Sequence, residues 1–455
     1  MRDAQPLTVD LLEEELCRHL DDPRTLRDLA EAARPADVAD VFNRLETDER
    51  CAVFRALTPE FASDVLAEVS PDVTRDLLES LSPAEAGHLL DLMPMDDVAE
   101  ILTEDVPEMQ QQLLQVMRAP DAAEVRDLLA YPPKSAGRIM TEKFVRVDPR
   151  MTAAEAVAQL RVVDEEVETI TDFYSLDAAG RLQGVVSLRE VMVAQPETPL
   201  GRIIRTDVIS VTPDTDQEEV ARLVSRYDFL ALPVVSSQGV MLGLVTVDDV
   251  IDVLLEEGSE DVLRFGGIEA GGMPAQPYFS IPLTSAVRRR AGWLLLLFVA
   301  ETATGIVLRV FDDELSRMVA LTFFIPLLIG TGGNTGAQTV STLIRGLALR
   351  EIQLRDTWRV LARELAGGLL LGLTLGVGAF GRALLWNSSM RLSVVVGLSV
   401  VVICTWANTI GALIPLVAQR FKIDPALVSA PLITTLVDAT GLAIYLLIAK
   451  SLLGL

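Results

Sequence analysis

Five long apolar stretches dominate the chain from Ala291 to its end. Each contains enough residues to cross a hydrocarbon core of about 30 Å at about 1.5 Å per residue. The chain before them is rich in acidic residues and has the composition of domains that face water. This pattern predicts a multidomain membrane protein that ends in a five-helix transmembrane domain, residues 291–455. The predicted spans are approximately 291–311, 318–341, 364–386, 392–418 and 427–449.

The first part of the chain, residues 1–133, contains a short helical repeat. Its prolines Pro35, Pro59, Pro83 and Pro107 are 24 residues apart, and an acidic, Ala/Leu-rich run follows each of them. Proline suits the first turn of a helix, so each unit is expected to hold two short helices and two turns. Stacked units of this kind form an all-α superhelical domain. Its role is either that of a plain scaffold or that of an acidic surface that meets cations or the neighbouring domain.

Two copies of a longer repeat follow within residues 134–257. The copies align so that Pro149 matches Pro213 and Gly184 matches Gly243. Runs of β-branched residues and turn glycines predict strand, helix, strand, turn, strand and helix in each copy. The matching segments are VRVDPRMTAAEAVAQL with VISVTPDTDQEEVARLV, and GRLQGVVSLREVM with GVMLGLVTVDDVI.

This second repeat resembles a tandem pair of CBS domains. The resemblance rests on LPVV at 232–235 and on a pattern of glycine, two hydrophobic residues, Thr or Ser, and a later acid, which ends at Asp249 and Glu190. In CBS pairs the final acid can bind the ribose of an adenosine. Glu190 replaces the more usual Asp in one copy, so nucleotide binding stays open.

A dense run of carboxylates continues from the second repeat on a predicted helix. Asp249, Asp252, Glu256 and Glu260 share one helix face, where like charges destabilise the helix unless something neutralises them. Hard divalent cations bind several converging carboxylate oxygens. We therefore expect a divalent-cation site here, with a solvated acidic face as the alternative. The whole run comprises Asp248, Asp249, Asp252, Glu256, Glu257, Glu260 and Asp261.

Charge and cysteine content narrow the function further. The chain holds 39 Lys/Arg and 65 Asp/Glu, of which 15 Lys/Arg and 9 Asp/Glu lie from Ile281 onward. Residues 1–280 therefore hold 24 Lys/Arg and 56 Asp/Glu, a net charge of −32. A region this acidic repels nucleic acid and attracts cations. Three scattered cysteines and two histidines argue against a disulfide framework and a zinc site. The N-terminus has no apolar region typical of a cleaved signal peptide.

Basic residues are unevenly distributed around the predicted spans. A linker, residues 258–290, ends in LTSAVRRR, which is predicted to form a short basic (plug) helix before span one. Ten basic residues fall on the linker side of the spans and five on the other. The positive-inside rule therefore places the N-terminal domains in the cytoplasm and the C-terminus outside. The ten are Arg288, Arg289, Arg290, Arg345, Arg350, Arg355, Arg359, Arg363, Arg420 and Lys422; the five are Arg309, Arg317, Arg382, Arg391 and Lys450.

Polar residues inside the spans indicate a path for a hard cation. Asp438 lies in the run PLITTLVDATGLAIYLLI, and a carboxylate near the middle of a membrane helix costs about 2.5–3.5 kcal/mol on insertion scales. Span two contains FIPLLIGTGGNTGAQ, whose proline and glycines predict close helix approach and a broken, carbonyl-exposing backbone. Oxygen donors without a thiol or imidazole cluster favour ions such as Mg²⁺. The positions concerned are Pro326, Gly330, Gly332, Gly333, Asn334, Gly336, Gln338, Asn408, Pro415, Pro431, Thr434 and Thr435.

The order of these elements resembles the MgtE family of magnesium transporters over essentially the whole chain. The most specific motifs are PLLIGTGGNTGAQ (326–338) and DPALVSAPLITTLVDATG (424–441). The resemblance implies a homodimeric, non-enzymatic Mg²⁺ channel in the cell (inner) membrane. Its pore would lie on the two-fold axis, with Asp438 of both subunits at the central site.

The resemblance also implies roles for further residues. Mg²⁺ bound among the N-terminal, CBS and linker elements would gate the pore. The metal ligands implied are Asp438 and Asn334 in the pore, Asp424 at its cytosolic side, and Asp249, Asp252, Glu257, Glu260 and Asp261 in the sensor; Pro326, Gly330, Gly333, Thr434 and Thr435 would line the pore, and Arg189, Glu190 and Phe229 would hold ATP.

Three alternative hypotheses for the function remain. Within transport, the chain could be a Co²⁺/Ni²⁺ carrier or a Na⁺-coupled exchanger of divalent cations. An intramembrane protease would need a catalytic pair or metal set, and the only other acids in the spans are Glu301 and Glu364. A CBS-based sensor that moves nothing would leave Asp438 and the GGN segment unexplained.

Overall fold

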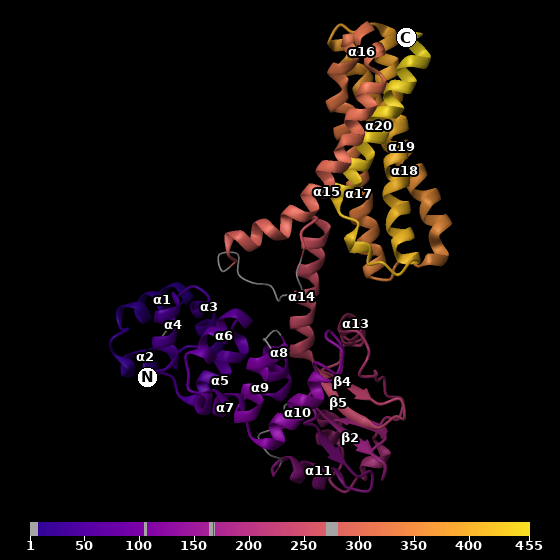
Figure 1. Ribbon diagram of the computed structural model, residues 1–455. Coiled ribbons are helices and arrows are strands. Elements are labelled where there is room, and N and C mark those ends of the chain that lie inside the picture. The colour runs from indigo at the N-terminus through magenta and orange to yellow at the C-terminus, as the bar shows by residue number, and fades with distance from the viewer. Residues whose placement is uncertain (1–7, 104–106, 163–166, 168, 270–280) are drawn as a thin grey trace. The chain divides into compact units, whose positions relative to one another are not determined.

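The computed structural model describes residues 8–103, 107–162, 167, 169–269 and 281–455 (Figure 1). The described residues divide into two compact units, one up to Glu257 and one from Gly258 onward. Part of the predicted linker, residues 270–280, lies outside the described residues.

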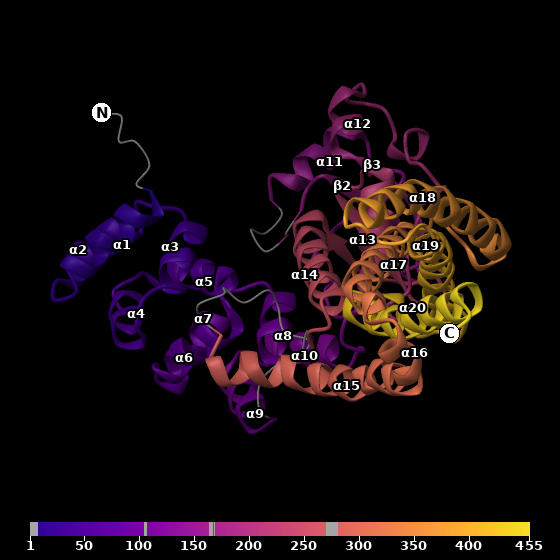
Figure 2. The same ribbon diagram turned by 90° about the horizontal axis from the view of Figure 1, so that it is seen from above.

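The first unit begins with a double row of short helices. Four of them start at the prolines of the 24-residue repeat, as predicted. Odd-numbered helices pack on the next odd-numbered helix from α1 to α9, and even-numbered ones do the same from α2 to α6 (Figure 2). This is the expected all-α superhelix. The helices are α1 (Val9–Arg18), α2 (Pro23–Ala30), α3 (Pro35–Phe42), α4 (Thr47–Phe54), α5 (Pro59–Glu68), α6 (Pro71–Glu79), α7 (Pro83–Leu90), α8 (Met95–Thr103), α9 (Pro107–Val116) and α10 (Ala119–Leu129).

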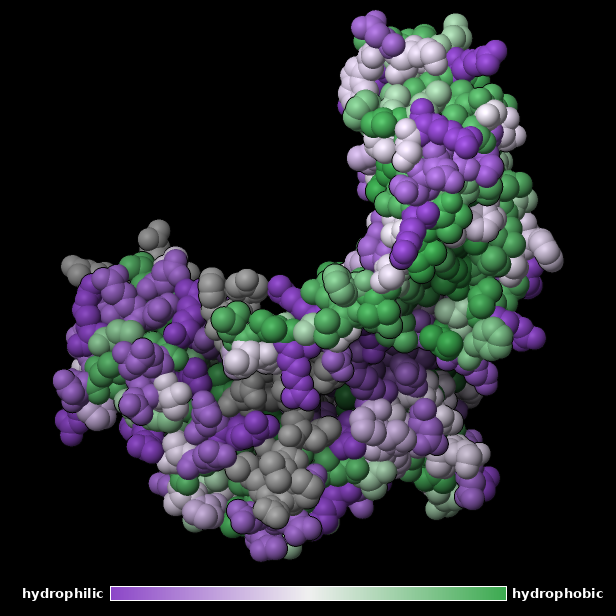
Figure 3. All heavy atoms as spheres, turned by 45° about the horizontal axis from the view of Figure 1, so that its top comes forward, coloured by the Kyte–Doolittle hydropathy of each residue, from purple (hydrophilic) through white to green (hydrophobic). Residues whose placement is uncertain are grey.

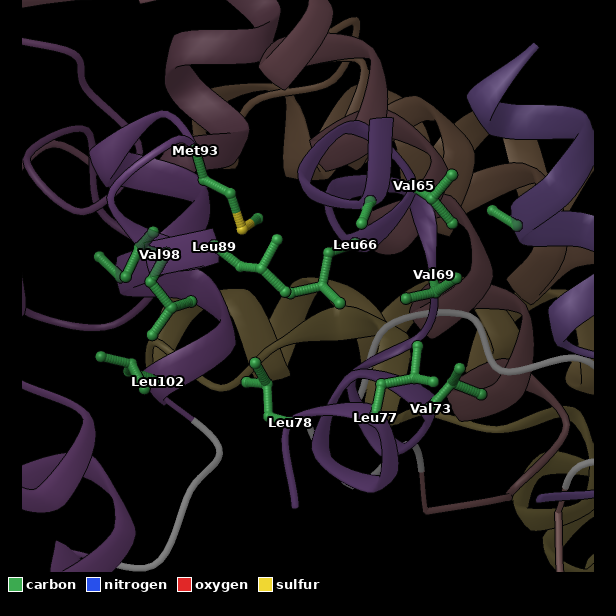
Figure 4. Packing of buried hydrophobic residues seen from close by; sticks show 14 of the residues in the cluster. Val65, Leu66, Val69, Val73, Leu77, Leu78, Leu89, Met93, Val98 and Leu102 are labelled. Atoms are coloured by element: carbon green, nitrogen blue, oxygen red, sulfur yellow. The ribbon is translucent and has the colours of Figure 1, made fainter. Parts of the chain in front are cut away.

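Aliphatic side chains fill the space between these helices. Leu66 of α5 and Leu89 of α7 point toward each other, and Val98 and Leu102 of α8 belong to the same core (Figure 4). Because each repeat buries its apolar face only against its neighbours, the stack is stabilised unit by unit.

The CBS-like repeat forms two small sheets. In the first copy, β1 runs parallel to β2 and β2 antiparallel to β3; in the second, β4 and β5 are antiparallel. Gly184 and Gly243 occupy equivalent positions in the two copies. A Cβ on Gly184 would lie 2.7 Å from the Arg205 carbonyl oxygen, and one on Gly243 would lie 2.5 Å from the Thr141 carbonyl oxygen. The elements are β1 (Val145–Val147), α11 (Ala153–Leu160), β2 (Asp172–Leu176), β3 (Leu182–Ser187), α12 (Leu188–Val193), α13 (Gln217–Tyr227), β4 (Ala231–Val235), β5 (Met241–Thr246) and α14 (Val247–Phe265).

One predicted strand of the second copy is reduced to a single bridge. Val211 donates its N–H to the Pro233 carbonyl and accepts one from Val235, at 3.0 and 2.8 Å. The next parallel pairing would need an N–H from Pro233 toward Ile209, and proline has none. The expected strand at 208–211 therefore does not form a ladder.

The second unit contains five helical segments that are long and apolar enough to span a membrane. Apolar residues predominate on their surface, whereas hydrophilic ones predominate on α1–α10 (Figure 3). Helix α17 packs against α19 and α20, α18 forms a hairpin with α19, and α15 packs along α20. The helices are α15 (Leu283–Val310), α16 (Asp312–Arg317), α17 (Ile325–Ala348), α18 (Thr357–Leu385), α19 (Met390–Arg420) and α20 (Ala430–Leu453), with a 3₁₀ turn at Val319–Phe324 before α17.

Two local expectations for this unit are wrong. The basic segment Leu283–Arg290 is not a separate short helix, because α15 continues from it without interruption to Val310. The GTGGNTG segment is not a break, because α17 is helical throughout Ile325–Ala348. Pro326 sits in the first turn of α17, where proline needs no N–H partner.

Candidate functional site

The inner face of α17 lets the neighbouring helices approach closely. A Cβ on Gly332 would lie 2.6 Å from Ile403 of α19, and one on Gly336 would lie 2.9 Å from Ile433 of α20. Both distances are shorter than a normal contact between carbon atoms, about 3.5–4.0 Å. The glycines therefore serve tight packing, which is the part of the sequence prediction that holds.

The opposite face of α17 is exposed and polar. Pro326, Gly330, Asn334 and Gln338 are all exposed and follow one another at intervals of four residues, which places them in one stripe along the helix. An amide exposed to hydrocarbon is costly, so such a stripe belongs against water or another protein surface. The stripe includes three of the residues predicted for the pore.

Asp438 lies beside this helix. A Cβ on Gly333 would be 3.4 Å from Asp438 Oδ1 and 2.8 Å from the Cγ2 atom of Thr434. Asp438 Oδ1 is buried and accepts no hydrogen bond from any described residue. The Thr434 hydroxyl donates to the Ala430 carbonyl at 3.0 Å, so its proton is already used within α20. The geometry leaves a carboxylate oxygen available to a ligand from outside the chain.

The carboxylates of α14 fall into two groups. In the first unit, Glu256 and Glu257 accept ion pairs from Lys134 at 3.2 and 3.0 Å, and Gln217 also donates to both. Asp249 accepts hydrogen bonds from the backbone and hydroxyl of Thr246 at the start of the helix. These contacts stabilise carboxylates whose partners could not be predicted from the neighbouring sequence.

Asp252 lies one helical turn after another acidic residue of α14, Asp248. Desolvation and then the charge of Asp248 raise the pKa of Asp252. Desolvation, Asp252 and Asp40 raise the pKa of Glu68 on α5. Burial thus disfavours the charged form of both groups, and the neighbouring carboxylates add to this effect.

In the second unit, a single arginine joins α14 to the segment before α20. Arg264 forms ion pairs with Glu260 of its own helix and with Asp424, the latter at 2.6 Å. Glu260 is buried, so its charge needs such a partner. Within the part of the chain that the structure describes, no three His, Cys, Asp or Glu side chains converge as a ready metal site.

A hollow in the CBS-like region contains one of the three predicted nucleotide-binding residues. Phe229 lines it, together with Arg205, Asp172 and Asp207. Glu190 is not among the lining residues but reaches Arg205 at 3.7 Å. Its carboxylate also accepts hydrogen bonds from Ser187, chiefly from the backbone N–H, which lower its pKa.

Arg189, the third predicted nucleotide ligand, is exposed on α12 and does not line the hollow. No sequence motif points to Arg205 or Asp207, which also line the hollow. Backbone pairing of Arg205 with Val185 of β3 brings the stretch that contains them to the hollow.

These features define a multi-pass membrane protein with a CBS-containing acidic part, and three comparisons assign it to a family. Family models match residues 325–448 (MgtE, divalent cation transporter), 33–134 (MgtE intracellular N domain), and 136–197 and 200–256 (CBS domain). The chain belongs to the MgtE family of divalent cation transporters. This confirms the predicted order of an all-α repeat domain, a CBS pair and a five-helix membrane domain, and the expectation of a non-enzymatic transport protein.

Curated relatives match almost end to end. The chain is 40% identical to the magnesium transporter MgtE of Thermus thermophilus over 95% of its own length and 96% of the relative. It is 34% identical to that of Bacillus subtilis, with 94% of each chain covered. A crystal structure of the cytosolic domain of the Mg²⁺ channel MgtE in complex with ATP matches with a TM-score of 0.51 and 37% identity, covering 53% of this chain and 99% of that one.

Proposed function

We propose that this protein is a homodimeric, Mg²⁺-selective channel for magnesium uptake, with Asp438 as the pore carboxylate. The observation that carries the proposal is the buried Asp438 oxygen without a partner, beside the tightly packed Gly333. Mg²⁺ takes oxygen ligands and keeps several waters. Two Asp438 side chains from a dimer would supply a charge of −2 to a hydrated divalent ion.

The exposed polar stripe on α17 supports a dimer. Pro326, Gly330 and Asn334 would line the pore where the two subunits meet, with Gly333, Thr434 and Thr435 around Asp438. In this arrangement the stripe faces water rather than lipid, which removes the cost of exposing the Asn334 amide to hydrocarbon.

The acidic cytosolic part would act as the magnesium sensor. At low Mg²⁺ its net charge of −32 keeps its parts repelled. At high Mg²⁺, ions bound by Asp249, Asp252, Glu257, Glu260 and Asp261 would draw these parts together and close the pore. Mg²⁺ has to compete with the cationic partners Lys134 and Arg264 for some of these carboxylates.

Asp424 connects this sensor to the membrane helices. It shares Arg264 with Glu260, so a change at α14 is transmitted to the segment that leads into α20. Bound Mg²⁺ between Glu260 and Asp424 would replace the guanidinium as the bridging charge. The basic start of α15, Arg288–Arg290, then favours a cytosolic position for this end of the membrane unit, with the C-terminus outside.

The CBS-like hollow is proposed as a nucleotide site. The cytosolic domain of the Mg²⁺ channel MgtE described above was solved in complex with ATP. In this chain Phe229 offers an aromatic face and Arg205 a cation, with Arg189 and Glu190 at the adjacent start of α12. ATP would then modulate the response of the CBS pair to Mg²⁺.

The test is cation uptake into liposomes that contain the purified full-length protein. Mg²⁺ influx, detected with a trapped dye, is expected without a sodium gradient and to exceed Co²⁺ and Ni²⁺ influx. Influx that requires a sodium gradient would favour a Na⁺-coupled exchanger, and preferential Co²⁺ or Ni²⁺ influx would favour the alternative carrier.

A further inference from the structure

Helices α15 and α20 run side by side in the same direction. At one end the Trp293 indole donates to the Ser429 hydroxyl at 3.0 Å, and at the other Lys450 of α20 pairs at 2.6 Å with Glu314 of α16, which directly follows α15. Glu301 follows Trp293 by eight residues, and Asp438 follows Ser429 by nine. At 1.5 Å per residue these positions are about 12 and 13.5 Å along their helices, so Glu301 and Asp438 lie at nearly the same depth.

Glu301 also lies on the face of α15 that contacts the rest of the unit. Leu297 and Thr304 are the buried residues of this helix. Glu301 is four residues after the first and three before the second, so it shares their face.

Among the threonines that the structure describes inside the spans, Thr304 is the one whose buried hydroxyl lacks a hydrogen bond. Its hydroxyl is buried, the residue is 9% exposed, and it has no hydrogen-bond partner among the described residues. In nine other threonines inside the spans the hydroxyl donates to the carbonyl four residues earlier, as is common for threonine in helices. Those that do so are Thr331, Thr335, Thr339, Thr342, Thr374, Thr405, Thr409, Thr434 and Thr440.

Glu301 itself is exposed in the single chain, and no hydrogen bond or ion pair reaches it from the described residues. A charged side chain in a span is rarely left to lipid and usually faces a water-filled cavity or a partner. Together, the two carboxylates at one depth and the unpaired Thr304 hydroxyl provide oxygen atoms of the kind that bind a hydrated divalent cation.

We propose that Glu301 is a second carboxylate of the permeation path, which binds a hydrated divalent cation together with Asp438 and the Thr304 hydroxyl. The proposal rests on the proposed pore function. A dimer would then hold four carboxylates at one level of the membrane instead of two, and the second pair would raise the local concentration of divalent ions.

The first test is Mg²⁺ influx into liposomes with full-length Glu301→Gln, Glu301→Asp and, as a matched intramembrane control, Glu364→Gln. Removing one unit charge about 8 Å from a divalent ion in water weakens binding of that ion about fivefold. The Glu301→Gln dimer loses two such charges. The half-saturating Mg²⁺ concentration is therefore expected to rise about 30-fold in Glu301→Gln. It should stay near wild type in Glu301→Asp and Glu364→Gln.

A wild-type half-saturating concentration in Glu301→Gln would overturn the proposal. If Asp438→Ala abolishes influx while Glu301→Gln is normal, only the role of Glu301 fails; normal influx in Asp438→Ala means that the proposed pore fails. Should Glu301→Gln not assemble, Thr304→Val keeps the carboxylate and is expected to raise the half-saturating concentration about threefold. An unchanged value in that variant would contradict the proposal.

The second test measures whether position 301 faces water. In a cysteine-free background, Glu301→Cys is expected to react with a cationic, water-soluble thiol reagent, and Mg²⁺ should slow the reaction. The control is Val299→Cys, which is exposed on roughly the opposite side of α15 and should react slowly. Equal, slow reaction at both positions would place Glu301 in lipid and overturn the proposal.

Discussion

Gly333→Ala tests the packing that holds Asp438. The new Cβ would lie 2.8 Å from Thr434 Cγ2 and 3.4 Å from Asp438 Oδ1. A normal carbon contact is about 3.5–4.0 Å, so α20 must shift by about 1 Å or the side chains must turn away. Either change moves the carboxylate that the proposed pore depends on.

The magnitude follows from two opposing effects. Overpacking of this kind costs about 1–3 kcal/mol, whereas replacing a helical glycine by alanine gains about 1 kcal/mol. Gly378→Ala has the second effect alone, because no atom lies within 4 Å of its Cβ. The two variants should therefore differ in stability by about 1–3 kcal/mol. If the strain falls on the ion-binding arrangement, Mg²⁺ affinity drops about 5–150-fold.

The assay compares thermal stability and Mg²⁺ influx for three variants. Gly376→Ala is the second control, because its Cβ would lie 2.8 Å from the Gly397 carbonyl oxygen, between α18 and α19. Gly376→Ala should lose stability but keep normal Mg²⁺ affinity once influx is corrected for folded protein, whereas Gly333→Ala should lose both. Normal affinity in Gly333→Ala would refute the reasoning.

Three further outcomes concern the cytosolic sensor. Neutralising Asp249, Asp252, Glu257 and Glu260 together should weaken closure by internal Mg²⁺ in patch recordings without abolishing current; unchanged closure would mean a solvated acidic face. Mg²⁺ should stabilise the isolated cytosolic part by about 2.7 kcal/mol at a hundredfold excess over Kd, which is measured as a rise in its melting temperature. An equal rise with NaCl at matched ionic strength would indicate simple screening. Because the pKa values of Glu68 and Asp252 are raised, this part should gain stability as pH falls through their raised pKa values toward ordinary carboxyl values. The gain should shrink in Asp252→Asn, and a pH profile that is unaltered by that change would contradict the assignment.

Periodic features were predictable from the sequence because each one repeats. The prolines at 24-residue spacing begin α3, α5, α7 and α9, where the missing N–H has no cost. The glycines in register, Gly184 and Gly243, fall at equivalent positions because the main chain of a neighbouring segment approaches each of them. Asp438 stood out because a carboxylate is rare in an apolar run.

Predictions from local composition failed where packing decides. Glycine lowers helix propensity by about 1 kcal/mol, yet α17 stays helical because Gly332 and Gly336 admit Ile403 and Ile433 at close range. The strand expected at 208–211 is lost because of Pro233, which lies on a different segment.

Contacts between distant residues left no local signal. Arg264 and Asp424 are 160 residues apart in the chain, and Lys134 and Glu257 are 123 apart. The acidic run therefore looked unpaired in the sequence, although several of its carboxylates have cationic or hydrogen-bonding partners. The unsatisfied hydroxyl of Thr304 likewise depends on the three-dimensional surroundings of α15.

The most direct test of the proposed pore is Mg²⁺ influx through Asp438→Ala in liposomes, with dimer assembly checked by size-exclusion chromatography. The account predicts a folded dimer with no Mg²⁺ influx, because the buried carboxylate oxygen that would meet the ion is removed. Near-normal Mg²⁺ influx in the assembled variant would contradict the assignment of Asp438 to the pore.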